Sequence, residues 1–454
     1  MSEAIPNPWT GKVEHRQPMM DAGQIEARQA AAASAFPSWA AQSFAARAAV
    51  LRAVAGLLRA RAEPLARLIT AEMGKLHREA VAEINKCAGV CDYYADHAEV
   101  MLADELVATE AQRSLVIHQP LGCVLAVMPW NFPFWQVFRF LAPTLMAGNV
   151  ALLKHATNVP RCADAIAALL REAGLADGVF GVLHIDNEQA AAVIADPRVV
   201  GVSLTGSERA GQSVAATAGR HLKKVVLELG GSDPFIVLPD ADLDEAVKAA
   251  VSSRFDNAGQ TCIAAKRFIV TDAIADAFVD ALVEQAQLRV YGDPSEMATT
   301  LAPMARADLR DGLHEQVVLS VTEGAVLRCG GMPVAGSHAG YPATVLDHVV
   351  PGMPAFDQEL FGPVAAVIRV PDAATAVQLA NASDYGLGGS VWTADLAAGE
   401  AIARQLACGA AFVNSVVRSD ARLPFGGIKR SGHGRELGRA GLLEFTNTKT
   451  LYVA

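Results

Sequence analysis

The apolar positions of this 454-residue chain follow two kinds of pattern. In the first hundred residues they recur three and four apart, which predicts helices over 21–35, 45–73 and 78–102. From residue 114 onward, short apolar runs alternate with helical stretches. Runs that are apolar throughout and separated by helices are typical of parallel strands covered on both faces. The pattern therefore predicts a doubly wound α/β unit, in which ligands bind at the carboxyl ends of the strands.

The pattern also gives the order of the elements. In the first unit we predict strands over 124–128, 151–154, 179–184, 199–205 and 225–229, with helices over 135–146, 160–173, 187–195 and 209–218. A second α/β unit follows, with strands over 267–270, 364–370 and 390–393 and helices over 273–290, 307–323, 373–382 and 397–406. Residues 114–118 and 446–453 are two further predicted strands. We expect them to form a protruding sheet whose exposed edge another subunit pairs.

Composition and charge exclude several classes of protein. With 52% hydrophobic and 19% charged residues the chain can bury a large core, so it is not intrinsically disordered. The net charge of −10 and the lack of a basic run exclude a nucleic-acid partner. The charge-free stretch 119–138 contains three prolines, so we expect no membrane span. Seven cysteines without a secretory signal predict free thiols in a cytoplasmic protein, and Cys87 and Cys91 are expected to be core residues rather than metal ligands.

Three side chains near predicted strand ends could carry chemistry. Asn131 lies between two prolines and could donate to an oxyanion, or it could cap the next helix. Glu228 follows a run of apolar residues, Val225–Leu227, and could be a desolvated general base, or backbone amides could satisfy it. Cys262 follows a turn at Gly259 and could be a thiolate nucleophile with its own N–H as oxyanion donor, or a structural thiol.

A possible anion site lies elsewhere in the first unit. Gly206 and Ser207 precede a predicted helix, whose free N–H groups favour an anion, and Lys154 ends another strand.

Taken together, the order and spacing of these segments resemble the aldehyde dehydrogenase superfamily across essentially the whole chain. The matching motifs are Pro-Trp-Asn-Phe-Pro (129–133), Lys154, Thr-Gly-Ser (205–207), Glu-Leu-Gly-Gly (228–231), Gly-Gln-Thr-Cys (259–262), Glu-Leu-Phe-Gly-Pro (359–363) and Pro-Phe-Gly-Gly (424–427). The resemblance implies that Cys262 attacks an aldehyde, that Asn131 and the Cys262 N–H hold the oxyanion, and that Glu228 activates water to hydrolyse the thioester. It also implies hydride transfer to a nicotinamide cofactor.

The resemblance further assigns a cofactor site. The matching residues are Trp130, Lys154, His155, Ala156, Thr157, Gly206, Ser207, Leu229, Glu359 and Phe361. Many members carry a glutamate at the position of Thr157, where it binds ribose hydroxyls. Without that carboxylate a 2′-phosphate is not repelled, so we expect either NAD or NADP to bind.

Within the superfamily the chain most resembles bacterial NAD(P)-dependent succinate-semialdehyde dehydrogenases. Segments 153–156, 228–238, 303–306 and 309–311 carry this likeness. It implies that Arg139 holds the distal carboxylate of the substrate, with Ser419 and the neighbouring Arg418 beside it. Arg139 could instead form a salt bridge on a helix surface. Asp256 stands where some of these enzymes carry a second arginine, which opposes an anionic substrate unless it pairs with Arg139 or Arg418.

The expected fold is thus two doubly wound α/β domains, Rossmann-like and catalytic, with a small oligomerisation sheet. The predicted boundaries are 1–107 and 120–229 for the dinucleotide-binding domain, 230–434 for the catalytic domain, and 108–119 and 435–454 for the oligomerisation segments. A homodimer or homotetramer and a small aldehyde substrate follow from the resemblance, and no metal is expected. A broad dehydrogenase for uncharged aldehydes, a thiol esterase, a CoA-acylating relative and a binding protein without turnover remain alternatives.

Overall fold

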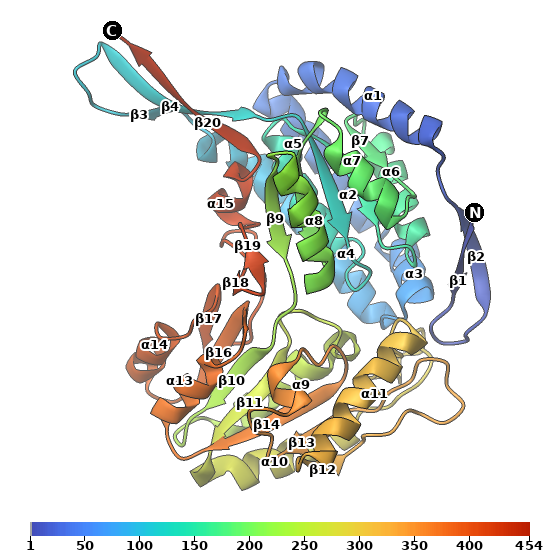
Figure 1. The fold of residues 1–454 in the computed structure, drawn as a ribbon, viewed down its shortest axis with the longest axis vertical. Coiled ribbons are helices and arrows are strands. Elements are labelled where there is room, and N and C mark those ends of the chain that lie inside the picture. Colours follow the sequence, from blue (N-terminus) through green and yellow to red (C-terminus); the bar gives the residue numbers. More distant parts are fainter. Residues whose placement is uncertain (1) are drawn as a thin grey trace.

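Two separate β-sheets, each with helices on its faces, make up most of the molecule (Figure 1). The structure is a computed structural model and describes residues 2–454. The prediction of two α/β units is confirmed. The exact residues at which one domain gives way to the next stay predictions.

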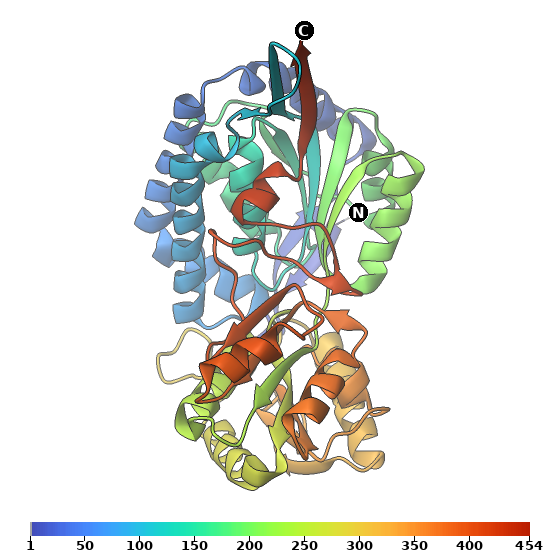
Figure 2. The ribbon, with the colours of Figure 1, turned by 90° about the vertical axis from the view of Figure 1, so that its left-hand side faces the viewer.

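The first sheet has the strand order β19-β9-β8-β5-β6-β7, and its neighbours pair in parallel except for β19 with β9. Its strands are β5 (Cys123–Met128), β6 (Val150–His155), β7 (Phe180–Val182), β8 (Val199–Thr205), β9 (Lys224–Glu228) and β19 (Gly432–His433). The helices of this part are α1 (Ala22–Ala40), α2 (Phe44–Ala60), α3 (Ala62–Met73), α4 (His77–Met101), α5 (Trp135–Met146), α6 (Pro160–Glu172), α7 (Asn187–Ala195), α8 (Glu208–Arg220) and α15 (Gly438–Leu443). Figure 2 shows the blue N-terminal helices on one side of this sheet and the green helices on the other.

The second sheet has the order β12-β13-β14-β11-β10-β16-β17, and only β12 runs antiparallel to its neighbour. Its strands are β10 (Asp233–Val237), β11 (Ala265–Thr271), β12 (Val326–Cys329), β13 (Thr344–Asp347), β14 (Val364–Val370), β16 (Gly388–Trp392) and β17 (Ala410–Val413). The helices around it are α9 (Leu243–Phe255), the short 3₁₀ helix η1 (Asp256–Gly259), α10 (Asp272–Gln287), α11 (Ala307–Thr322), α12 (Pro354–Asp357), α13 (Ala373–Asn381) and α14 (Leu396–Ala403).

A third, three-stranded sheet extends away from the body, with the C-terminus at its tip (Figure 1). It contains β3 (Glu105–Leu106), β4 (Arg113–Pro120) and β20 (Thr446–Val453). The predicted pairing of 114–118 with 446–453 is confirmed, because β20 pairs with β4 in antiparallel register along its whole length. Two small hairpins complete the fold, β1 (Ser2–Pro6) with β2 (Val13–Pro18) and β15 (Tyr385–Gly386) with β18 (Ile428–Lys429).

Two prolines explain two of the differences between the predicted and the observed elements, which also include the unpredicted α9, β12, β13 and β17. The single helix expected over 45–73 is two helices that meet at Arg61, because the ring of Pro64 would clash with the carbonyl of residue 60 in one continuous helix. The interior strand β10 was missed because it contains Pro234, and proline usually argues against a strand inside a sheet. Here the register shifts between Asp233 and Pro234, so the missing N–H falls at an irregular point of the ladder.

Candidate active site

Two cavities meet at the thiol of Cys262. The first, of about 350 Å³, lies between α4, α5 and the loops that follow α9 and β17, and we call it the inner cavity. The second, of about 250 Å³, lies at the carboxyl ends of β5, β8 and β9, and we call it the strand-end cavity. Cys262 and Gln136 line both. A sulfur at this junction can attack a molecule in one cavity while a second ligand occupies the other.

The loop before Cys262 has an unusual backbone. Asn257, Ala258 and Gly259 all have positive φ, of 54°, 52° and 71°. A Cβ on Gly259 would lie 2.2 Å from the carbonyl oxygen of Gly362, so only glycine fits there. Such strain persists only where the surroundings fix it. The turn predicted at Gly259 is present and is held tightly.

The side-chain amide of Asn131 lies against this loop. Its Nδ2 donates to the carbonyl of Gln260 at 3.0 Å, and its Oδ1 accepts from Gln136 Nε2 at 3.1 Å. The side chain of Asn257 donates to the main-chain carbonyl of Asn131 at 3.0 Å. An amide nitrogen carries two hydrogens, so one remains free for an oxyanion.

A buried ion pair fixes the start of α5, next to Asn131. Glu83 Oε1 accepts the N–H groups of Phe134 and Trp135 at 2.9 and 3.0 Å. Glu83 also pairs with the fully buried Lys75, whose Nζ lies 3.6 Å from the centre of the Phe132 ring. The interpretation of Asn131 as a helix cap is therefore wrong. Glu83 satisfies these amides, and the N-cap residue of α5 is Phe134, whose side chain makes no capping hydrogen bond.

Burial raises the pKa of both predicted reacting groups. It raises the pKa of the Cys262 thiol to about 11, although Arg139 and Lys266 act to lower it. It raises the pKa of Glu228 well above its ordinary value, against the influence of Arg139. Both carboxyl oxygens of Glu228 are buried without a hydrogen-bond partner among the described residues. Backbone amides therefore do not satisfy Glu228, and a carboxyl group in this state suits a general base.

Arg139 is buried on α5 and is already paired. It forms an ion pair with Glu436 and donates from Nη2 to Thr205 Oγ1 at 3.1 Å. Burial alone would lower the pKa of Arg139, but Glu436 and Glu228 raise it above its ordinary value. The helix-surface salt bridge considered for Arg139 is thus wrong, because the residue lines the inner cavity and is only 2% exposed.

Lys86 brings a second cation to the inner cavity. Its Nζ donates to Ser419 Oγ at 2.7 Å and lies 4.1 Å from the centre of the Trp135 ring. The pKa of Lys86 is lowered to about 8, mainly because the ammonium is partly removed from water and also because Arg139 is close. Lys86 has no carboxylate partner among the described residues. Ser419 thus lines the cavity as expected, and the cation that contacts it is Lys86, which was not predicted.

The other predicted charges near the substrate are placed differently. Arg418 is exposed and does not line the inner cavity, so the charge expected from it is absent there. Asp256 does line the cavity, and its Oδ2 accepts from Ser252 Oγ at 2.6 Å rather than pairing with either arginine. Glu79 lies nearby, and burial raises the pKa of Glu79 to about 7.

The strand-end cavity is built from most of the predicted cofactor residues. Its lining includes Trp130, Gly206, Ser207, Leu229, Glu359 and Phe361. Ser207 caps α8, so the N–H groups at the start of a 13-residue helix face this region. The rings of Trp130 and Phe361 meet edge to face, with 5.9 Å between their centres.

Lys154 tests whether a dinucleotide fits beside this cavity. It is the penultimate residue of β6, next to β5 in the sheet, and it is 8% exposed. Burial lowers the pKa of Lys154, and the ammonium forms no ion pair within residues 2–454. A largely buried ammonium without a partner needs an acceptor, and ribose hydroxyls supply one. The donor set therefore fits the predicted cofactor.

Of the three residues after Lys154, His155 is a structural residue, and Ala156 and Thr157 are more exposed to solvent. His155 is buried, with its Nε2 2.9 Å from the carbonyl of Pro133 and its Nδ1 accepting from Ala156 N–H at 2.9 Å. Burial lowers the pKa of His155 to about 4. Both ring nitrogens are thus occupied, and the imidazole joins β6 to the Asn131 loop instead of facing a cofactor. Ala156 is half-buried and Thr157 is exposed, directly beyond the strand.

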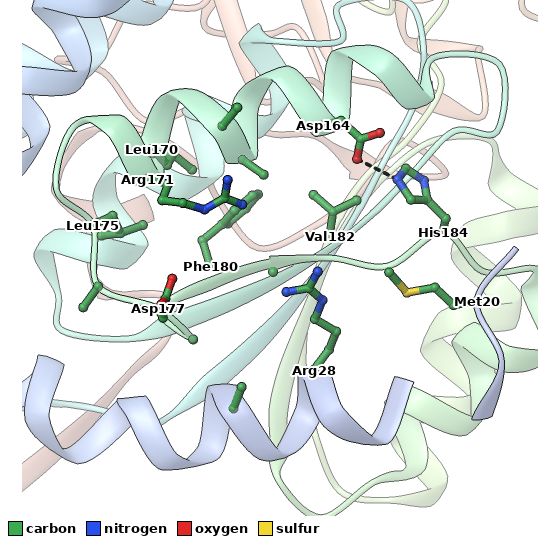
Figure 3. A pocket seen from close by; sticks show the side chains of 16 residues that line it. Met20, Arg28, Asp164, Leu170, Arg171, Leu175, Asp177, Phe180, Val182 and His184 are labelled. Carbon is green, nitrogen blue, oxygen red and sulfur yellow. Dashed lines mark hydrogen bonds and ion pairs between the residues drawn. The ribbon is translucent and has the colours of Figure 1, made fainter. Parts of the chain in front are cut away.

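A third cavity, of about 540 Å³, lies apart from this site (Figure 3). It is bounded by α1, α6 and the edge strand β7, and Asp164 and His184 form an ion pair at its rim. It contains none of the predicted site residues. Within residues 2–454 no helix could cross a membrane, and no cluster of His, Cys, Asp and Glu could hold a metal.

Four charged residues in or beside the site were missed from the sequence. Glu79, Glu83 and Lys86 share one face of α4, because they are spaced four and three apart. Charged residues spaced three and four apart on one face of a predicted helix were a usable signal. Lys266, at the start of the fully buried strand β11, was a second one.

Both the sequence and the fold are similar to those of known proteins. The sequence model described as Aldehyde dehydrogenase family matches residues 2–451. A Synechocystis protein named a probable succinate-semialdehyde dehydrogenase (NADP+) is 49% identical over 454 residues, covering 100% of both chains. The succinate semialdehyde dehydrogenase (NAD(P)+) Sad of Escherichia coli is 48% identical, covering 98% of this chain and 96% of that one. The crystal structure of a succinic semialdehyde dehydrogenase from Streptococcus pyogenes with NADP+ is similar at a TM-score of 0.96 and 39% identity, covering 99% of both chains.

Proposed function

Because the chain belongs to the aldehyde dehydrogenase family, we propose that it oxidises succinate semialdehyde to succinate with NAD or NADP. One observation carries the choice of substrate. The inner cavity has the Cys262 thiol in its wall and also contains Lys86, Arg139 and Ser419. An aldehyde that enters it can meet the sulfur with one end and hydrogen-bond donors with a carboxylate at the other.

The residues of the chain divide the chemistry among them. The thiolate of Cys262 adds to the aldehyde carbon, and the Asn131 amide and the Cys262 N–H stabilise the oxyanion of the thiohemiacetal. NAD or NADP, when bound, supplies the acceptor for the hydride that leaves this carbon, so that a thioester remains on Cys262. Glu228 then takes a proton from water, the resulting hydroxide attacks the thioester, and the acid leaves as the thiol is restored.

The strand-end cavity would hold the cofactor. Glu359 lines this cavity and Lys154 lies beside it, and both would hold ribose hydroxyls of the cofactor, while the start of α8 at Ser207 would hold the pyrophosphate. Thr157, where many family members have glutamate, leaves room for a 2′-phosphate without repulsion. The named relatives include enzymes of both NADP and NAD(P) type, which supports use of either cofactor.

Lys86 is the group most open to a substrate carboxylate. Arg139 is committed to Glu436, whereas Lys86 is held only by a hydroxyl and an aromatic ring. Replacing Arg139 would also leave Glu436 buried and unpaired, which costs stability. Lys86 therefore gives the cleaner test of the substrate class.

The Lys86→Met variant is expected to lose about ten- to a hundredfold in kcat/KM for succinate semialdehyde, which is the worth of one charged hydrogen bond. Its kcat/KM for butanal should stay unchanged. In the parent protein the preference for succinate semialdehyde should weaken above the pKa of Lys86, about 8, because the ammonium loses its charge there. Initial rates of nicotinamide reduction with each cofactor and each aldehyde measure this.

Lys248→Met, at an exposed ion pair with Glu245 on α9, is the matched control and should behave as the parent. Equal kcat/KM for the two aldehydes in the parent protein would reject the succinate-semialdehyde assignment. That outcome favours a second function, oxidation of an uncharged aldehyde, which Asp256 and Glu79 in the same cavity wall support because both oppose an anion.

We also propose that the protein forms a homodimer or homotetramer through the protruding sheet. β20 is an edge strand of eight residues, and Leu451 and Tyr452 on it are 36% and 51% exposed. An unpaired edge of this length is a template for another strand. Light scattering on the eluting protein should give a mass of two or four chains, and a stable monomer would contradict the proposal.

The cytoplasmic location stays a proposal. Each of the seven cysteines is a free thiol, and four of them are buried, as expected for a protein kept in a reducing compartment.

A further inference from the structure

The ammonium of Lys266 lies beneath the peptide that carries the nucleophile. This lysine is fully buried at the start of β11. Its Nζ donates to the main-chain carbonyls of Thr261 and Cys262 at 2.9 and 2.7 Å. It also lies 3.3 Å from Glu359 Oε1. Lys266 thus donates hydrogen bonds to two main-chain carbonyls and forms an ion pair with Glu359.

Glu359 divides its two oxygens between this lysine and the strand-end cavity. Oε1 contacts Lys266 and accepts the Gly231 N–H at 3.1 Å. No described residue donates a hydrogen bond to Oε2, and Glu359 lines the cavity. One carboxylate thus reaches both the nucleophile peptide, through Lys266, and the space assigned to the cofactor.

We propose that Lys266 is a positioning residue, which fixes the Thr261–Cys262 carbonyls and joins the nucleophile loop to Glu359 on the cofactor side. Holding these carbonyls also fixes the orientation of the Cys262 peptide, whose N–H is the oxyanion donor. The inference rests on the proposed function only in taking Cys262 as the nucleophile.

The charges around the thiol determine the direction in which each substitution should shift the pKa of Cys262. Four charged groups face Cys262: Arg139 from α5, Lys266 from β11, Glu359 from the loop before β14 and Glu228 from β9. The two cations lower the pKa of Cys262 and the two carboxylates raise it, against a larger effect of burial. Removing Lys266 should therefore reduce the thiolate fraction, and removing the Glu359 charge should increase it.

Alkylation of the full-length protein by iodoacetamide, without substrate or cofactor, tests this directly. At about pH 8, below the pKa of the thiol, the rate is proportional to the thiolate fraction. Lys266→Met should slow alkylation of Cys262 about tenfold, as for a shift of one pKa unit. Glu359→Gln should accelerate it, and Lys266→Arg should restore much of the parent rate. Mass spectrometry follows the Cys262 peptide, with the partly exposed Cys329 and Cys408 as internal standards.

A purely structural lysine would not give opposite shifts in the two variants. Equal Cys262 rates in the parent, Lys266→Met and Glu359→Gln, with melting temperatures unchanged, would overturn the proposal. If Lys266→Met does not fold, Lys266→Gln decides, because it keeps a donor, loses the charge and should also slow alkylation. Lys248→Met is the surface control. The readout needs no turnover, so failure of the proposed oxidation would appear separately, as a parent protein that alkylates normally but reduces no nicotinamide.

Discussion

Replacing Cys262 by alanine is expected to abolish aldehyde oxidation, with a loss of at least about ten-thousandfold in kcat/KM. No other thiol within residues 2–454 lines either the inner or the strand-end cavity. Without the sulfur neither a thiohemiacetal nor a thioester can form, and the hydrated aldehyde has no covalent path. The absorbance of reduced nicotinamide, followed with succinate semialdehyde and each cofactor, measures the loss.

Cys408→Ala is the matched control, because this partly exposed thiol lies in the second domain and its Sγ contacts the carbonyl of Ala410 at 3.2 Å. It should keep the activity of the parent. Full activity in Cys262→Ala would reject the covalent mechanism outright. A parent protein that hydrolyses an activated ester through Cys262 but never reduces nicotinamide would instead support the thiol esterase alternative.

The main elements of the fold could be predicted because their patterns are local. The buried strands β6 and β14 appear as mostly apolar runs between helices, which few other structures produce. The pairing of β20 with β4 could be expected because residues 114–118 alternate like a half-buried strand, and the tail is one more strand too far from the others for a simple hairpin. The helix break at Arg61 follows from a clash between Pro64 and a carbonyl one turn earlier. That is a steric detail which apolar periodicity does not record.

The candidate site was predictable only where motifs carry it. Asn131 and Cys262 stand in unusual local sequences, and the structure brings both to the cavity walls. Lys86 and Lys266 have no motif, because their roles come from contacts across the fold, with Ser419 in one case and Glu359 in the other. For Arg139 the sequence predicted the location but not the partner. Its position was predicted, but its pairing with the distant Glu436 was not visible in the local sequence.

Glu228→Gln is expected to separate the two halves of the reaction. Attack by Cys262 and hydride loss do not need the carboxylate, so about one equivalent of reduced nicotinamide per site should appear rapidly. Hydrolysis of the thioester should then slow by about a hundred- to ten-thousandfold, since a general base contributes that much. Stopped-flow absorbance shows the burst and the slow phase, and mass spectrometry should find the acyl group on Cys262. Glu188→Gln, an exposed carboxylate on α7, should show no burst beyond the parent.

The pH dependence supplies a second test, because the hydrolysis rate and the free energy of unfolding should change with pH in opposite directions. Only ionised Glu228 can accept a proton, and burial raises the pKa of Glu228, so the hydrolysis rate of the parent should rise with pH above the ordinary range of glutamate. Over the same interval the folded state binds more protons at this site than the unfolded state does, so the contribution of Glu228 to the free energy of unfolding falls as pH rises. Glu228→Gln should remove both dependences, and its melting temperature at neutral pH should equal or exceed that of the parent, because an unpaired buried carboxyl has been replaced by a neutral amide. A burst-free variant with parental kcat at every pH would show that another group activates the water.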